Sequence, residues 1–443
     1  MTRRSQGATP LSQVDAFFVA YQQEGGILMQ VGAEAEIEGS LQKQDIEQML
    51  VYVITRWPQL GQRLKRRAFG LAWQGKTSID GMLRIEGDVN ALARWFNEPI
   101  DPFTQPPFQV LWVAMHDVHY LSFRGHHAAA DGEAFFFSVK EALRALASVL
   151  GGGVAAPAPA RFVALKEAIS TTGPVRASDL RVFWDYLRWL KVESLSGNSA
   201  NLWKHECCPG DVAQCERVIQ GDLLSRFHET AREKGVLPMW LAAAAWILAL
   251  HKWNVLHHNG YPTTISLEVP VSLKRDHLRE GSLGNLISPL ILYGDPSRTV
   301  KDIASSLKQQ LFSGLRNRLH IAVPYCTRMG SMLPWPIFKR LAVRTSSTGF
   351  ATSHFTWLPQ EEEFLTDIVQ FSRGAMRIVR QGLCTPVCLH MGATLSVLVL
   401  QEKIKFFINY RKTALNVEDA NKLADLLINA AIPTRAACEE MLM

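Results

Sequence analysis

The sequence predicts an α+β protein that folds into two lobes of similar size. A chain of 443 residues exceeds what one ordinary hydrophobic core holds, so two domains are expected. Glycine, alanine and proline dominate residues 151–160, the clearest linker in the chain. Strand-like and helical patterns occur on both sides of it. We therefore expect a first lobe over 1–153, a crossover over 154–212 and a second lobe over 213–443.

Local sequence patterns predict the helices and strands of the first lobe. Apolar residues recur at helical spacing up to Trp57, and Pro58 ends that helix. Two apolar runs joined by a polar corner predict a hairpin, and the glycines after Leu150 close the helix that follows it. Strands are thus predicted at 29–38, 109–115 and 119–126, and helices at 45–57 and 133–150.

The crossover and the second lobe follow the same logic. A tryptophan-rich segment predicts a helix over about 178–192 in the crossover. Pro238 suits the first turn of a very apolar helix, and the last two strands form a hairpin. Helices are predicted at 222–234, 238–253 and 418–429, and strands at 216–219, 263–269, 287–293, 352–357, 368–371, 393–400 and 403–410.

Composition excludes several classes of protein. The net charge of +6 is mild and spread along the chain, unlike the concentrated basic stripe of nucleic-acid-binding proteins. The longest apolar run, 239–250, is twelve residues long, whereas a bilayer span needs roughly 20, so we expect no transmembrane segment. Seven cysteines form no regular framework, which favours a reducing, cytoplasmic setting, with peripheral attachment to a membrane left open.

Two further patterns predict no site. His205, Cys207, Cys208 and Cys215 lack the paired spacing of a zinc site, so we expect no metal. His257 and His258 are followed by a loop-like Asn-Gly-Tyr-Pro. We also expect no cofactor.

The strongest chemical pattern lies where the predicted hairpin gives way to a helix. Residues 124–132 read Arg-Gly-His-His-Ala-Ala-Ala-Asp-Gly. A strand end delivers side chains to a cleft on a rigid element, and a neutral imidazole is a natural general base near pH 7. Asp131, four residues on, is placed either to accept a hydrogen bond or to fix the local backbone through a cation elsewhere, and Gly132 allows a tight turn that brings a backbone N–H close to a ligand.

This pattern resembles the His-His-x-x-x-Asp-Gly signature of the acyltransferase superfamily that includes chloramphenicol acetyltransferase, peptide-synthetase condensation domains, wax ester synthases/diacylglycerol acyltransferases and polyketide-associated acyltransferases. The likeness continues in order along the chain. The segments that carry it are 10–18, 57–64, 100–107 and 269–285.

The resemblance implies the fold and the roles of the site residues. It implies two chloramphenicol-acetyltransferase-like lobes around a central tunnel, with His127 as the general base at the point where the substrates meet. His126 is implied to be structural, and Asp131 to orient the loop through an arginine. Arg63 is the candidate for that ion pair, the alternative being an exposed cation at a helix end. The backbone N–H of Gly132 is the candidate oxyanion donor.

The implied reaction moves an acyl group from coenzyme A, or from the phosphopantetheine arm of an acyl carrier protein, onto the hydroxyl of a small-molecule or lipid acceptor. Two alternatives remain: a free-standing condensation enzyme that forms an amide, and a non-catalytic binding protein that retains the fold. In the second half, Leu237–Trp240 replaces the Asn-Asp of wax ester synthases, and His354 stands where they carry asparagine. A neutral lipid product is therefore not assumed.

Overall fold

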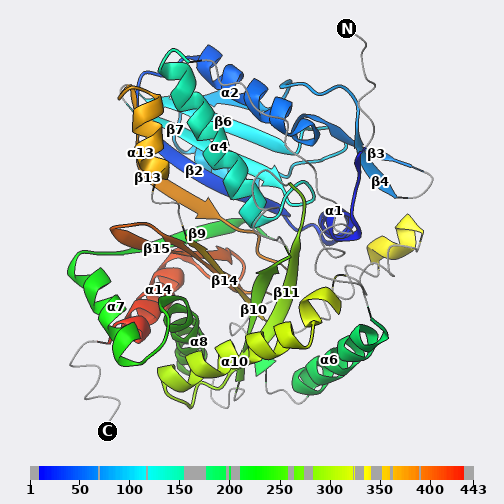
Figure 1. The fold of residues 1–443 in the computed structure, drawn as a ribbon, viewed down its shortest axis with the longest axis vertical. Coiled ribbons are helices and arrows are strands. Elements are labelled where there is room, and N and C mark those ends of the chain that lie inside the picture. The colour runs from blue at the N-terminus through cyan, green and yellow to red at the C-terminus, as the bar shows by residue number, and fades with distance from the viewer. Residues whose placement is uncertain are drawn as a thin grey trace.

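The computed structural model describes residues 9–67, 70–115, 118–153, 176–195, 199–200, 210–257, 264–273, 283–322, 324, 334–340, 352–359, 363–388 and 391–433. Within these residues the chain forms two lobes, one above the other in Figure 1. Residues 154–160 of the predicted linker lie outside them, as do His205, Cys207, Cys208 and His258. The predicted architecture of two α+β lobes is confirmed.

The first lobe is built on a five-stranded sheet of order β13-β2-β7-β6-β5. Most pairs are antiparallel, including the predicted hairpin β6–β7, whereas β5 and β6 are parallel. A smaller sheet, β1-β4-β3, lies beside it. The bounds are β1 Thr9–Pro10, β2 Gln30–Gly39, β3 Arg63–Arg66, β4 Leu71–Gln74, β5 Leu83–Glu86, β6 Phe108–Met115, β7 Val118–His126 and β13 Met376–Cys384.

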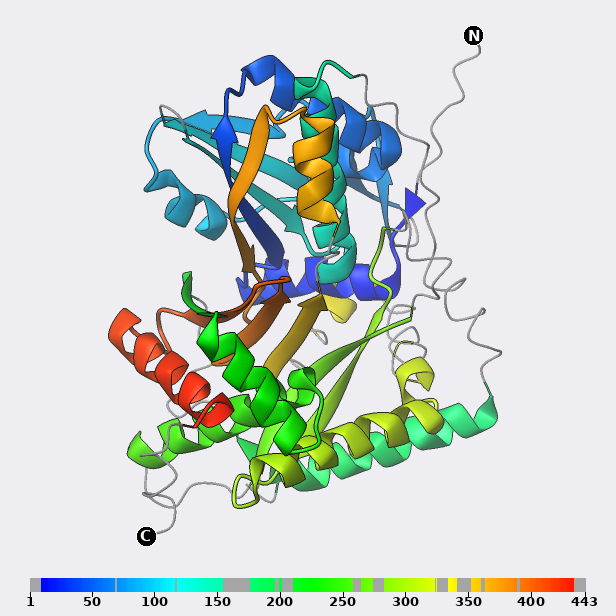
Figure 2. The same cartoon turned by 60° about the vertical axis from the view of Figure 1, so that its left-hand side comes forward.

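Helices cover one face of the five-stranded sheet, with α4 lying between α2 and α13 (Figures 1 and 2). The helix α4 is amphipathic, and its buried side includes Phe135, Val139 and Leu143. The bounds are α1 Gln13–Gly25, α2 Lys43–Arg56, α3 Ala91–Asn97, α4 Gly132–Leu150 and α13 Phe364–Phe371, with a short 3₁₀ helix over Pro58–Gly61.

The second lobe is a mixed sheet of order β11-β10-β12-β14-β15-β9. Its outer face packs on the apolar helix α8, which α10 and α14 flank. The bounds are β8 Ser199–Ala200, β9 Val212–Gln220, β10 Thr264–Ser272, β11 Ile287–Gly294, β12 Ser353–Pro359, β14 Ala393–Val399, β15 Lys403–Arg411, α7 Asp222–Glu233, α8 Pro238–His257, α10 Val300–Arg316 and α14 Val417–Ala431.

The crossover helix α6, Ala177–Leu195, runs along the second lobe, and it was predicted from its tryptophan-rich sequence. The Tyr186 hydroxyl accepts a hydrogen bond from Ile291 N (2.9 Å) on the edge strand β11. Asp179 forms an ion pair with Arg318 (3.0 Å). These contacts attach the crossover to the second lobe.

Two elements of the second half belong to the first lobe, which corrects the predicted boundaries. Strand β13 pairs antiparallel with β2, and α13 packs on α4, where Arg144 pairs with Asp367 (3.0 Å). The predicted strand over 368–371 is wrong, because these residues belong to helix α13. The buried side of that helix carries Phe364 and Ile368, which lie one helical turn apart. Strand β13 was not predicted. Residues 364–384 are therefore an insertion of the second half into the first lobe.

Among the described residues, no single helix combines the length and hydropathy of a bilayer span. Helices α7 and α8 pass such a test only as a pair, and they meet at 95°.

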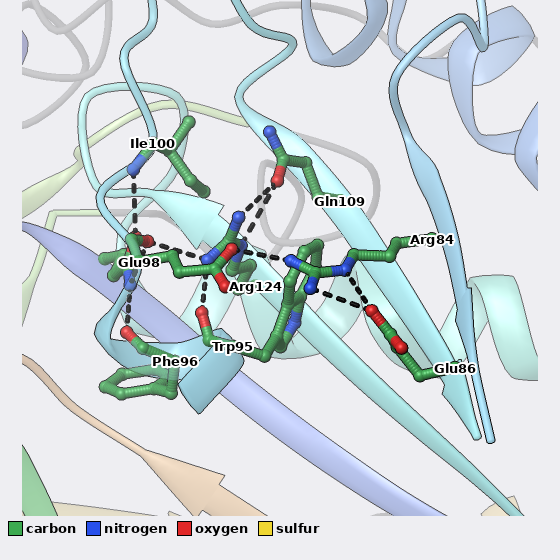
Figure 3. Close-up of polar contacts among 9 residues, drawn as sticks. Arg84, Glu86, Trp95, Phe96, Glu98, Ile100, Gln109 and Arg124 are labelled. Atoms are coloured by element: carbon green, nitrogen blue, oxygen red, sulfur yellow. Dashed lines mark hydrogen bonds and ion pairs between the residues drawn. The ribbon is translucent and has the colours of Figure 1, made fainter. Parts of the chain in front are cut away.

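A buried arginine of β7, the strand that leads to the motif, contacts the C-terminal end of α3 and the residue after it (Figure 3). Arg124 is 2% exposed, and its guanidinium lies 3.4 Å from the centre of the Trp95 ring. It donates hydrogen bonds to the carbonyls of Trp95 and Glu98 and to the Gln109 side chain. Burial lowers the pKa of Arg124 to about 10, so the group stays charged at neutral pH. Its removal would leave several buried acceptors unpaired.

We expect Arg124→Met to lower the free energy of unfolding by about 2–4 kcal/mol, because buried acceptors that lose a charged donor stay unpaired. Arg84→Met is the matched control. Arg84 also lies over Trp95, at 5.7 Å, but is 41% exposed, and its ion pairs contribute about 0–1 kcal/mol. Denaturant unfolding measures both, and equal losses would contradict the role given to Arg124.

Candidate functional site

The predicted motif lies at the boundary between the two lobes, in the turn that joins β7 to α4. His127 N donates to Met29 O (2.8 Å), and Ala129 N donates to His126 O (2.9 Å). Asp131 caps α4, since its side chain accepts a hydrogen bond from Ala134 N (2.8 Å). The turn is thus fixed on both sides of the imidazole.

The His127 side chain is held by an asparagine of the second lobe. Its Nδ1 lies 2.8 Å from Oδ1 of Asn285. The Asn285 Nδ2 donates to the His127 carbonyl oxygen (2.6 Å) and to Oδ1 of Asp15 (2.6 Å). A carbonyl oxygen only accepts, so this contact fixes the orientation of the amide. Asn285 Oδ1 must therefore accept the Nδ1–H of His127, which leaves a lone pair on Nε2.

Asp15 supports this arrangement from helix α1. Its carboxylate also accepts the N–H of Ser12 (2.8 Å) and forms a capping box with that residue. Burial raises the pKa of Asp15, and the hydrogen bonds from Asn285 and Ser12 oppose that rise. Three segments far apart in the sequence therefore meet at one amide.

The Nε2 of His127 has no hydrogen-bond partner among the residues that the structure describes. The ring stacks on Phe18 with centroids 4.0 Å apart, and the residue is 8% exposed. Burial lowers the pKa of His127, while Asp131 and the Asn285 hydrogen bond act against it. The imidazole is therefore neutral at pH 7, with Nε2 available as a base.

Asp131 ties the turn to the second lobe as well as to α4. Its second carboxylate oxygen accepts the N–H of Leu286 (2.9 Å), and its own N–H donates to Gly284 O (3.4 Å). These contacts flank Asn285 on both sides in the sequence. Asp131 thus positions the segment that holds His127.

His126 and Gly132 complete the motif in different ways. Nδ1 of His126 accepts the N–H of Ala128 (3.0 Å), and burial lowers the pKa of His126 to about 3. Its Nε2 is buried and has no hydrogen-bond partner within the described ranges of the chain. Gly132 does not have a positive φ, so a turn conformation does not explain the glycine. A Cβ there would meet no described atom within 4 Å, which leaves room beside the first turn of α4.

The predicted ion pair between Arg63 and Asp131 is absent. Arg63 lies on β3, and its guanidinium donates to the carbonyls of Gly61 (3.1 Å), Asp80 (3.0 Å) and Thr104 (3.3 Å). These three acceptors occupy the guanidinium within the first lobe. Arg63 is therefore a local tether there.

Sequence reasoning assigned no role to Asn285, Asp15 or Phe18. Each lies in a segment that carried the resemblance, and Asp15 stands three residues after Ser12, as in a capping box. That spacing identifies a helix start but gives no sign of a contact with the second lobe.

Comparisons with known proteins relate the fold to solved structures. No family model and no curated protein matches the sequence. The first condensation domain of the calcium-dependent antibiotic synthetase, solved with a substrate analogue, is similar with a TM-score of 0.69 and 14% identity over 97% of both chains. The starter condensation domain of rhizomide synthetase, a mutant in complex with C8-CoA and Leu-SNAC, gives 0.67 and 14%, covering 96% of this chain and 94% of that one.

A third similar structure is the X-domain of teicoplanin biosynthesis in complex with OxyB, with a TM-score of 0.60 and 15% identity, covering 97% of this chain and 94% of that one. The fold of this chain is thus the condensation-domain fold, with two chloramphenicol-acetyltransferase-like lobes, as the resemblance implied.

We expect ¹⁵N NMR of the histidine side chains to show His127 as the Nδ1–H tautomer, with a pKa below the ordinary value of about 6.5. The pKa falls because burial penalises the imidazolium. The resonances of His127 are assigned as those that are missing from the spectrum of His127→Gln. An Nε2–H tautomer, or a pKa at or above the ordinary value, would contradict the arrangement.

Proposed function

We propose that this condensation-domain fold serves as an acyltransferase, in which His127 is the general base for attack of an acceptor on an acyl thioester. The observation that carries the proposal is the oriented imidazole, whose Nε2 lone pair has no partner among the described residues. Orientation of a base by a buried hydrogen bond is the arrangement that general-base catalysis needs.

The mechanism requires one base and no covalent enzyme intermediate. His127 Nε2 takes the proton of an acceptor hydroxyl or amine as that atom attacks the thioester carbonyl, giving a tetrahedral oxyanion. The C–S bond then breaks, and the proton on Nε2 passes to the leaving thiolate. The products are the acylated acceptor and free thiol, with His127 neutral again.

The first turn of α4 is suited to stabilise the oxyanion. The Gly132 N–H has no hydrogen-bond partner among the described residues, and it lies at the positive end of the helix dipole. The open space beside Gly132 would admit the carbonyl oxygen. We propose this N–H as the oxyanion donor.

We propose acyl-coenzyme A or a carrier-bound acyl group as donor and a hydroxyl as acceptor. An amine acceptor is the second candidate, because the similar rhizomide domain was solved with C8-CoA and Leu-SNAC together. Both reactions use the same base. Incubation with panels of alcohols and amines distinguishes the two reactions. Mass spectrometry then shows whether the product is an ester or an amide.

A non-catalytic binding role is the rival of another class. The X-domain of teicoplanin biosynthesis forms a complex with OxyB. A binding protein has no need of an imidazole held in one tautomer, and here three segments fix that tautomer. Turnover of acyl-coenzyme A in the presence of acceptors discriminates the two roles.

We expect His127→Ala to reduce acyl transfer by about 10²–10⁴-fold, the usual contribution of a general base, with the fold retained. Octanoyl-coenzyme A with the alcohol and amine panels supplies the assay, and release of free thiol is measured. The control is His228→Ala on the exposed surface of α7, which should leave the rate unchanged. Transfer by His127→Ala at the parental rate would refute the assignment.

We expect Asn285→Ala to lower kcat by at least about tenfold with little change in KM, since the base loses its orientation. The Asn285 hydrogen bond raises the pKa of His127, so its loss should move the acidic limb of the pH–rate profile to lower pH. A rate unaffected at every pH, in protein that unfolds like the parent, would show that Asn285 does not position the base.

A further inference from the structure

The sheet of the second lobe has two chemically different faces. Side chains on the outer face belong to the apolar core with α8, including Leu267, Phe355 and Leu395. The alternate side chains face the first lobe, as Leu358 and Phe407 show by packing against the first lobe's core. Most of the remaining residues of this inner face are polar: Ser266, Glu268, His354, Thr356, Thr394, Ser396, Lys405 and Asn409.

Most of these polar residues are buried. Thr394 and Ser396 are fully buried and lie 3.1 Å from the Thr385 hydroxyl, which also accepts a hydrogen bond from Asn409 (3.0 Å). The side chains of Glu268 and His354, by contrast, are each 19% exposed. This part of the inner face therefore keeps access to solvent.

The accessible residues form a hydrogen-bonded series across two neighbouring strands. Glu268 on β10 stands opposite His354 on β12, and Oε1 of Glu268 lies 3.4 Å from Nδ1 of His354. Nε2 of His354 lies 2.7 Å from the hydroxyl oxygen of Thr356, two residues along β12. All three side chains project from the same face of the sheet.

The series has a defined direction when the imidazole is neutral. A carboxylate only accepts, so it takes the Nδ1–H, and Nε2 of His354 then accepts the hydroxyl hydrogen of Thr356. The Thr356 oxygen is left with lone pairs for any further partner. The Thr356 end of the series therefore offers a hydrogen-bond acceptor, which matches a ligand group with an O–H or N–H.

The series lies near the proposed base. Ser272, four residues along β10 from Glu268 and on the same face, donates a hydrogen bond to Oε2 of Glu133 (3.2 Å) in the first turn of α4, directly after the motif. His127 is fixed on the first-lobe side of the boundary, and His354 on the second-lobe side. A ligand that reaches His127 would therefore come near this face.

We propose that Glu268, His354 and Thr356 form the acceptor-binding site, and that the acceptor carries a second hydroxyl or amino group besides the one that reacts. The inference rests on the proposed acyl transfer. A purely apolar alcohol would exclude water from the Thr356 oxygen without offering a hydrogen bond to its remaining lone pairs. The site therefore discriminates against long-chain monohydric alcohols.

The test compares matched acceptors with octanoyl-coenzyme A as donor. The acceptors are n-hexanol and the hexanediol with a hydroxyl at each end. One added hydrogen bond of about 1–1.5 kcal/mol corresponds to about a tenfold higher kcat/KM for the diol. Its second reacting hydroxyl adds a statistical factor of about two, so the expected preference is about twentyfold, of which about twofold does not depend on the hydrogen bond.

Variants at Thr356 show whether the series causes the preference. Thr356→Val keeps the shape but removes the hydroxyl, and should reduce the preference for the diol to the statistical factor of about two. Thr356→Ser restores the hydroxyl and should keep the preference. His354→Phe, which removes the partner that orients Thr356, should behave like Thr356→Val.

The outcomes separate this inference from the proposed function. His127-dependent transfer with only the statistical preference of about twofold for the diol, or a larger preference that survives in Thr356→Val, overturns the acceptor site alone. Absence of any His127-dependent transfer overturns both. A KM for octanoyl-coenzyme A that rises with the loss of preference would assign the series to the donor side and also overturn the proposal.

Discussion

The amide of Asn285 is the contact on which the candidate site depends. It joins the buried carboxyl of Asp15, the backbone of the motif and the imidazole of His127. Because the partner of the ring is neutral, it fixes the tautomer and raises the pKa less than a directly bonded carboxylate would. Burial can then keep the ring unprotonated, which suits a base that works near neutrality.

Polar contacts in two places join the two lobes. Asp131 of the motif accepts the N–H of Leu286, and Asn97 exchanges two hydrogen bonds with the backbone of Val212 at the start of β9. The lobes are thus joined by specific polar contacts at the motif and on the far side of the first sheet. Rotation of one lobe against the other would break the contacts that orient His127. The proposed substrates would therefore reach the base without such a rotation.

Much of the fold could be predicted because its signals are local. The hairpin β6–β7, the helix α4 and its glycine terminus follow from period, turn chemistry and capping, and they place His127 and Asp131 correctly. Short apolar runs do not distinguish helix from strand by pattern alone, which explains the error at 368–371. The Asn285 contact spans 158 residues, and no local pattern encodes such a pairing. The ion pair predicted for Arg63 was wrong because its guanidinium is bound by backbone carbonyls, which every residue carries and which a sequence therefore cannot distinguish.

The late position of strand β13 in the sequence affects how the first lobe folds. It closes one edge of the first sheet although it is synthesised more than 200 residues after β7. A fragment cut at the linker would expose β2 as an unpaired edge, a template for association with other chains. The first lobe therefore completes its folding only when most of the second has left the ribosome, and its exposed edge needs protection until then.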